Sequence, residues 1–246
     1  MNALMKLTWV DFKLFSRSAI VVFFTFAFPV LNMLLFGGMY GNTPEQIFGG
    51  FGAADVLVPG YLAALVIGST AFMNLPLEIA TRRQFGVLRR LRASPLHPAT
   101  VIGAQVAVSL FTAALSTVLL IATAALAFGA VLPKAPLALA AAFTLCSLSL
   151  YALSMCVANL FRSVNAARAV FMAVFFPMMF ISGGTLPRQF LPEVMQTIAK
   201  FMPLTYAVDL IRGIYLDAHW DLTALAVLSS ILLVFGVLSV RFFRWE

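Results

Sequence analysis

Charged residues are scarce in this chain. Only 10% of its 246 residues are Asp, Glu, Lys or Arg, whereas 62% are hydrophobic. Soluble domains carry about 25% charged residues, so the composition excludes a soluble globular protein. The formal net charge of +7 would suggest nucleic acid as the partner of a soluble protein. Here the cations gather at the ends of apolar runs, which indicates an anionic membrane surface and no nucleic acid partner.

The long apolar runs lack ionisable side chains. No Asp, Glu, Lys, Arg or His lies within the six segments expected to span the membrane, whereas proton-coupled carriers and intramembrane enzymes keep such groups at membrane depth. His97 and His219 have no partners at metal-ligand spacing. Cys146 and Cys156 stand about 15 Å apart on one expected helix, too far for a disulfide. We therefore expect no catalytic, metal-binding or cofactor-binding residue on this chain.

Phosphate-binding and hydrolase motifs are missing as well. The chain has no GxxxxGK(S/T), HExxH or GxSxG pattern, so we do not expect it to be an enzyme. If it transports a solute, the energy must come from another chain.

Six uncharged runs are long enough to cross a bilayer, which takes about 20 apolar residues per helix. Proline interrupts the first, second and fifth runs, which indicates kinked helices that face other helices. The sequence predicts an all-α polytopic integral membrane protein, with residues 1–246 forming a single transmembrane domain. The predicted spans are 20–39, 56–77, 100–131, 136–160, 169–186 and 222–240.

Positive charge is distributed unequally over the connecting segments. Twelve of the sixteen Lys and Arg residues fall on the side that holds both chain ends, and four fall on the other side. By the positive-inside rule we expect both termini in the cytoplasm. We further expect the membrane to be the inner (cell) membrane of a bacterium or archaeon.

The densest group of cations lies in residues 78–98, between the second and third spans. Five arginines within eleven residues cannot lie in lipid, because each costs about 2.5–3.5 kcal/mol at the bilayer centre. Glu78 stands four residues before Arg82 as a favourable helical pair, and Gly86 permits a bend. The segment is either a topogenic loop on anionic headgroups or a helix that docks a cytoplasmic partner. The candidate docking residues are Glu78, Arg82, Arg83, Gly86, Leu88, Arg89, Arg90, Leu91 and Pro95.

Residues 1–18 are basic and amphipathic and do not form a span. Lys6, Lys13 and Arg17 fall on one sector of a helix, and Trp9 lies among the apolar residues. This pattern is typical of an interfacial helix on the cytoplasmic surface. A frayed lead-in to the first span is the alternative.

Residues 187–221 lie between the last two spans and are too irregular to cross the membrane. Leu191-Pro192-Glu193 is typical of a helix start, and a second helical pattern follows Pro203. We expect two short amphipathic helices on the outer face, with a plain surface hairpin as the alternative. The candidate outer gate residues are Gly183, Gly184, Pro187, Pro203, Asp209 and Arg212.

Taken together, the chain resembles the ABC-2 type permeases of ATP-driven exporters over essentially its full length. One motif is similar to the family's coupling-helix segment, and it runs Gly86-Val87-Leu88-Arg89-Arg90-Leu91 and then Ser94-Pro95-Leu96. A second comprises Ser182-Gly183-Gly184, Pro203-Leu204-Thr205-Tyr206, Asp209 and Arg212. Met202 departs from the family, which often has a small polar residue at that turn.

The resemblance implies a half-transporter that acts as a homodimer with two nucleotide-binding ATPase subunits, on which ATP and Mg²⁺ would be bound. Those subunits would grip the N-terminal helix and residues 78–95, and the substrate path would form between the two copies. The first, second and fifth helices would line it, with Phe28, Asn32, Asn74 and Met178 as candidate path residues.

Aromatic composition bears on the substrate. The spans carry many Phe and Met residues, but only Tyr61 and Tyr151 as polar aromatics. This favours an amphiphilic drug, antibiotic or lipid-like substrate over a polysaccharide or glycolipid, although helix packing accounts for most of these Phe and Met residues. A membrane scaffold that binds a cytoplasmic partner and moves nothing is the alternative from another class.

Overall fold

The computed structural model describes residues 3–92, 98–161, 163–185 and 187–242. These residues form helices and connecting loops without a strand. Six helical segments in this part of the chain are long and apolar enough to cross a membrane, which confirms the predicted all-α polytopic architecture. They are Ala19–Tyr40, Gln46–Gln84, Ala99–Phe128, Pro136–Ala158, Val164–Ile181 and Leu222–Arg241.

The first two spans are interrupted helices. Helix α1 (Ala3–Arg17) precedes the first span, which consists of α2 (Ala19–Val22), a π-helical turn (Phe23–Ala27) and α3 (Phe28–Tyr40). The second span is divided in the same way and leads into a short further helix. Its parts are α4 (Ala53–Tyr61), π-helical turns at Leu62–Ile67 and Thr70–Asn74, α5 (Leu75–Gln84) and the following α6 (Val87–Arg92).

The described residues from Pro98 onwards form six α-helices. They are α7 (Pro98–Phe128), α8 (Pro136–Ala158), α9 (Val164–Ile181), α10 (Glu193–Ala199), α11 (Pro203–Asp217) and α12 (Leu222–Arg241). The two short helices expected before the last span are therefore present as α10 and α11. Helix α11 is more than a surface helix, because Leu204, Val208 and Ile211 are fully buried and it packs against α4, α8 and α12.

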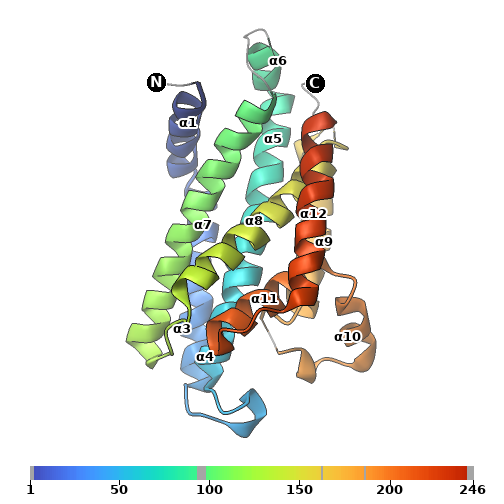
Figure 1. Cartoon of the computed structure of the whole chain (residues 1–246). Coiled ribbons are helices and arrows are strands. Elements are labelled where there is room, and N and C mark those ends of the chain that lie inside the picture. The colour runs from blue at the N-terminus through green and yellow to red at the C-terminus, as the bar shows by residue number, and fades with distance from the viewer. Residues whose placement is uncertain (1–2, 93–97, 162, 186, 243–246) are drawn as a thin grey trace.

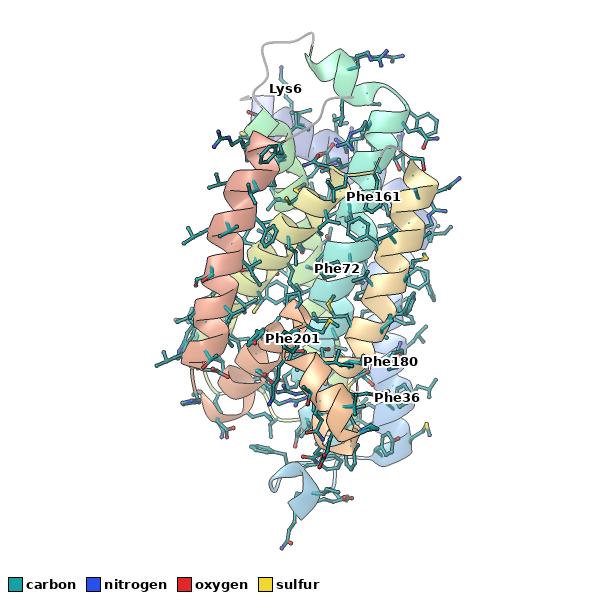
Figure 2. The ribbon with its side chains drawn as sticks, turned by 90° about the vertical axis from the view of Figure 1, so that its right-hand side faces the viewer. Lys6, Phe36, Phe72, Phe161, Phe180 and Phe201 are labelled. Carbon is teal, nitrogen blue, oxygen red and sulfur yellow. The ribbon has the colours of Figure 1, made fainter. Side chains whose placement is uncertain are left out.

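Both chain ends and α6 lie at one end of the bundle, called the arginine end below, and α10 lies at the opposite end (Figure 1). The second span occupies the interior, with 94% of its apolar stretch enclosed by the rest of the chain. Within this interior Phe72 lies 6.1 Å from Phe175 and 6.4 Å from Phe171 of α9 between ring centroids, and Phe161 packs on Phe171 from the arginine end (Figure 2).

The fifth span is displaced from its predicted position at 169–186. It begins at Val164, where the Ser163 hydroxyl accepts a hydrogen bond from the Ala166 N–H at 3.2 Å and caps the helix. It ends at Ile181, before a glycine turn. The charge within the first turns misled the prediction, because an arginine excluded from lipid can still be helical at the bundle end.

The third span is shorter than the predicted 100–131. Helix α7 ends at Phe128 because Gly129 adopts a φ of +63°, in the left-handed region that terminates helices. Its 31 residues still measure about 46 Å, against about 30 Å of hydrocarbon. The helix therefore projects from the hydrocarbon layer or tilts within it, as the sequence indicated.

Pro29 explains the π-helical turn in the first span. Proline has no N–H, so the Thr25 carbonyl four residues earlier loses its helical partner. The Ser116 hydroxyl of α7 donates to this carbonyl at 2.6 Å instead. A buried carbonyl in a membrane needs such a replacement, so this bond fixes α7 against the kink.

Glycines allow a close crossing near the opposite end of the bundle. A Cβ atom on Gly60 of α4 would lie 2.3 Å from the Gly184 carbonyl oxygen, and one on Gly184 would lie 2.3 Å from the Ala64 Cβ. The turn after α9 therefore rests directly on α4 because neither glycine has a side chain.

Gly60→Ala is expected to lower the melting temperature of the detergent-purified protein by several degrees, since overpacking costs about 1–3 kcal/mol. Gly236→Ala in α12 is the matched control, because nothing lies within 4 Å of a Cβ at that position. Equal melting temperatures for the two variants would contradict the close packing of Gly60 on Gly184, because the backbone there would then accommodate a Cβ atom without cost.

Candidate functional site

The last turn of α5 lies at the arginine end and carries two buried arginines. The guanidinium of Arg82 donates to the Asp11 carboxylate of α1 at 2.7 Å and to the Glu78 carboxylate at 2.9 Å. Arg82 and Asp11 are 7% and 6% exposed, while Glu78 reaches solvent. Arg82, which the sequence placed among the candidate docking residues, is therefore buried, and its charge is balanced inside the protein.

Arg83 is also buried, and it binds the end of α8. Its guanidinium donates to the Phe161 carbonyl and the Asn159 side-chain oxygen, each at 2.9 Å, and to the Ala158 carbonyl at 3.3 Å. A cation at a helix C-terminus is favoured by the helix dipole and by its unpaired carbonyls. Arg83 is therefore a second candidate docking residue that is buried in the bundle.

Gln84 adds a third connection, because its side-chain oxygen accepts from the Val164 N–H at the start of α9 at 3.1 Å. Three consecutive residues thus bind α1, α8 and α9. We call Arg82, Arg83 and Gln84 the α5 clamp. Any displacement of this turn acts on three helices at once.

Gly86 turns the chain from α5 into α6 with a φ of +70°, as the sequence predicted for a bend. Phe85 beside it is 70% exposed, whereas Leu88 is fully buried. Leu88 therefore anchors α6 to the bundle and does not present its side chain to a partner. The exposed residues here are Phe85, Val87, Arg89 and Arg90, called the α6 surface below. The Leu91 side chain and Pro95 lie outside the described part of the chain.

Helix α1 places its predicted residues on the outside. Lys6, Trp9, Lys13 and Arg17 are exposed, and the Lys13 ammonium lies 5.3 Å from the centroid of the Trp9 ring. The opposite side of α1 packs on α7. This arrangement fits a helix that lies along a membrane surface.

Asp11 escaped the sequence analysis. It is the one acid of the basic helix α1, and its place among the apolar positions was the available signal. Burial raises the pKa of the Asp11 carboxyl, while the hydrogen bond and charge of Arg82 oppose that rise. The partners are 71 positions apart, so no local pattern reveals the pair.

At the opposite end, polar bonds hold the turn after α9 onto α11. Arg212 donates to the Gly183 carbonyl at 2.8 Å, and Arg188 forms an ion pair with Asp209. Gly183 adopts a φ of +82°. Burial raises the pKa of Asp209, which the Arg188 charge opposes, and burial lowers the pKa of Arg212. The structure thus brings together four of the candidate gate residues, which are Gly183, Gly184, Asp209 and Arg212.

The two prolines among the candidate gate residues lie in the segment from the end of α9 to the start of α11. Pro187 precedes a short 3₁₀ turn, Arg188–Phe190, and Pro203 is the first residue of α11. Pro203 begins the helix without loss, because the N–H at that position has no helical partner.

Asp55 is a second residue that sequence reasoning missed. Its carboxylate accepts from the Asn42 side chain at 3.1 Å, the Gly52 N–H at 3.0 Å and the Val131 N–H at 2.8 Å. Asp55 lies in the first turn of α4 and is 5% exposed. It joins the loops before α4 and after α7.

The candidate path residues belong to the first, second and fifth spans. The Asn32 amide donates to the Phe28 carbonyl of its own helix at 2.8 Å. The Asn74 amide donates to the Thr25 hydroxyl at 3.0 Å and so connects the first two spans. Met178 is 2% exposed within the chain. Their role in a substrate path stays a prediction.

Metal-ligating side chains are not grouped in the described part of the chain, where no cluster of three or more His, Cys, Asp or Glu residues could hold an ion. The arrangement offers mechanical connections, because buried polar bonds join both ends of the second span to its neighbours.

A double-mutant cycle between Asp11→Asn and Arg82→Gln is expected to give a coupling free energy of about 2–3 kcal/mol, because each single change leaves a buried polar group unpaired. Unfolding of the purified protein in mixed micelles measures it. The exposed pair Lys134 and Asp217, 3.8 Å apart, is the control and should give about 0–1 kcal/mol. Similar couplings would contradict a structural role for the buried pair.

Comparison with known proteins identifies the family of this chain. The family model described as ABC-2 type transporter matches residues 2–216. The protein named "Putative transport permease ycf38" of Porphyra purpurea is 29% identical over 200 residues, covering 79% of this chain and 67% of its own length. That of Pyropia yezoensis is 27% identical over 207 residues, covering 82% and 70%. Nodulation protein J of Rhizobium leguminosarum bv. trifolii is 50% identical over 40 residues, which is 16% of this chain and 15% of that protein.

The family match covers most of the length of this chain, as the motifs predicted. This chain therefore belongs to the ABC-2 type transporter family and is a multi-pass membrane transport subunit.

Proposed function

We propose that this chain is the permease of an exporter driven by a separate ABC-type ATPase, which binds ATP and Mg²⁺ and docks at the arginine end. The observation that carries the proposal is the α5 clamp directly behind the α6 surface. The family implies such an ATPase partner. The excess of Lys and Arg at the arginine end supports a cytoplasmic position for it and for both termini.

The clamp offers a route for the motion. A force on α6 acts through Leu88 and the Gly86 turn on the end of α5. The buried bonds of Arg82 and Arg83 are costly to break, so α1, α8 and α9 would move with α5 as one body. The second span then continues to the Gly60 crossing at the opposite end. Two rigid arrangements with different affinity for the nucleotide-bound partner would suffice for transport.

A second copy of the chain would complete the substrate path. Helices α3 and α9 have faces that the single chain leaves uncovered, including Leu31, Leu35 and Phe180. Lipid or a second copy can cover such faces, and the family resemblance favours a homodimer. Phe36 and Phe180 lie toward the same side of the bundle (Figure 2).

An amphiphilic substrate fits the aromatic side chains better than a glycan does. Sugars stack on exposed Tyr and Trp rings, but Tyr61 is 1% exposed and Tyr151 is fully buried. Tyr40, at the end of the first span, is the one exposed tyrosine of the described spans, and the other exposed large apolar residues there are Phe, Leu, Ile, Val and Met. These suit apolar ligands of variable shape, as a drug, antibiotic or lipid-like compound would be.

Phe85→Ser is expected to reduce recovery of the ATPase in a mild-detergent pull-down about tenfold or more, since an exposed aromatic anchor at a docking surface contributes strongly to binding. Leu91→Asp is expected to act in the same way. Phe201→Ser is the control, because Phe201 is 84% exposed and precedes α11 at the opposite end. Partners are identified by mass.

Normal ATPase recovery with Phe85→Ser and Leu91→Asp would remove α6 from the docking surface. If the folded wild-type chain recovered no ATPase, the scaffold hypothesis would replace the exporter.

In a reconstituted complex, amphiphilic compounds are expected to stimulate ATP hydrolysis, while polysaccharides of similar concentration should not. The rate of phosphate release measures both. Stimulation by polysaccharides alone would overturn the proposed substrate class and leave the ATPase docking unaffected.

A further inference from the structure

A cavity with polar and apolar walls lies beside the α5 clamp, between α1, the start of the first span, α5 and α7. Its polar lining includes Asp11, Glu78 and Arg82, and Gln105 reaches it from α7. Apolar side chains such as Leu14 form other parts of the wall. Because α1 is expected to lie along the membrane surface, the cavity is at the depth of lipid headgroups.

Two groups that line this cavity lack hydrogen-bond partners. Gln105 is 4% exposed, and neither its amide nitrogen nor its amide oxygen has a partner. The Asp11 Oδ2 atom is buried without a partner, while Oδ1 binds Arg82. Buried polar atoms in native proteins are nearly always satisfied by protein, water or ligand. The side chains therefore indicate that something polar occupies the cavity.

The charges of the lining restrict what that group can be. Asp11 and Glu78 carry two negative charges, Arg82 carries one positive charge, and Gln105 of α7 is neutral, so the facing groups sum to one negative charge. The unpartnered oxygens of Asp11 and Gln105 need hydrogen-bond donors. A primary ammonium supplies both the charge and three N–H donors. A quaternary ammonium supplies only the charge.

We propose that this cavity binds the primary ammonium head of an amphiphile, with the alkyl part along Leu14 and the neighbouring apolar wall. The source is either a membrane aminophospholipid such as phosphatidylethanolamine or a free alkylamine. The cavity shares Glu78 and Arg82 with the candidate docking residues and Asn74 with the candidate path residues, but binding of an ammonium requires neither the ATPase nor transport.

The test compares ligands that differ only in N–H groups, using the full chain. In lipid nanodiscs, phosphatidylethanolamine is expected to raise the melting temperature by a few degrees above phosphatidylcholine. In detergent, dodecylammonium is compared with dodecyltrimethylammonium. A preference for the primary ammonium in nanodiscs alone identifies the lipid as the ligand. A preference in both arms shows that the site also binds free alkylamines. No preference in either arm overturns the proposal.

Gln105→Met removes the amide at similar volume and should weaken the preference about tenfold, because the amide oxygen that accepts from the ammonium is lost. Thr117→Val is the control, since the Thr117 hydroxyl is an unpartnered buried group on the same helix but does not line the cavity. Retention of the preference in Gln105→Met would overturn the site.

A measurement on the wild-type chain covers the case in which Gln105→Met does not fold. A photoreactive phosphatidylethanolamine should label peptides of α1 and α7, and excess phosphatidylethanolamine, but not phosphatidylcholine, should suppress that labelling. Labelling confined to other helices would contradict the site.

Discussion

The structure depends on one constraint: a charge that leaves water must be neutralised by the same chain. Arg82 is the clearest case, because its guanidinium is enclosed and bound to carboxylates from α1 and α5. Removing the Asp11 carboxylate would leave the buried Arg82 without its buried partner, which is far more costly than losing a surface ion pair. The position of α1 against the bundle, and with it the N-terminal end of the first span, follows from that balance.

The same constraint explains which parts of the fold the sequence could predict. The absence of charge over long runs located all six spans, and the dense arginines located α6. The boundaries of α9 were missed because hydropathy reports what lipid excludes, and Arg168 is excluded from lipid while remaining helical. A cap such as that of Ser163 depends on backbone geometry that composition does not record.

The roles of single residues were less accessible. Arg83 belongs by sequence to a basic surface segment, yet its three acceptors come from the end of α8 and the residues after it. Nothing in the sequence around Asp55 distinguishes it from an ordinary loop acid. Only the folded chain places the Val131 N–H against its carboxylate. Long-range hydrogen bonds of this kind have no periodicity, so a single sequence supplies no signal for them.

The π-helical turns of the second span have a consequence for orientation. Each such turn accommodates one residue beyond the α-helical count, and one residue corresponds to about 100° of rotation about the helix axis. The turns at Leu62–Ile67 and Thr70–Asn74 therefore set the direction in which Arg82 and Arg83 point relative to Gly60. In this span the number of residues specifies an angle as well as a length, so relatives of this chain should tolerate substitutions between Gly60 and Arg82 far better than insertions or deletions of one residue.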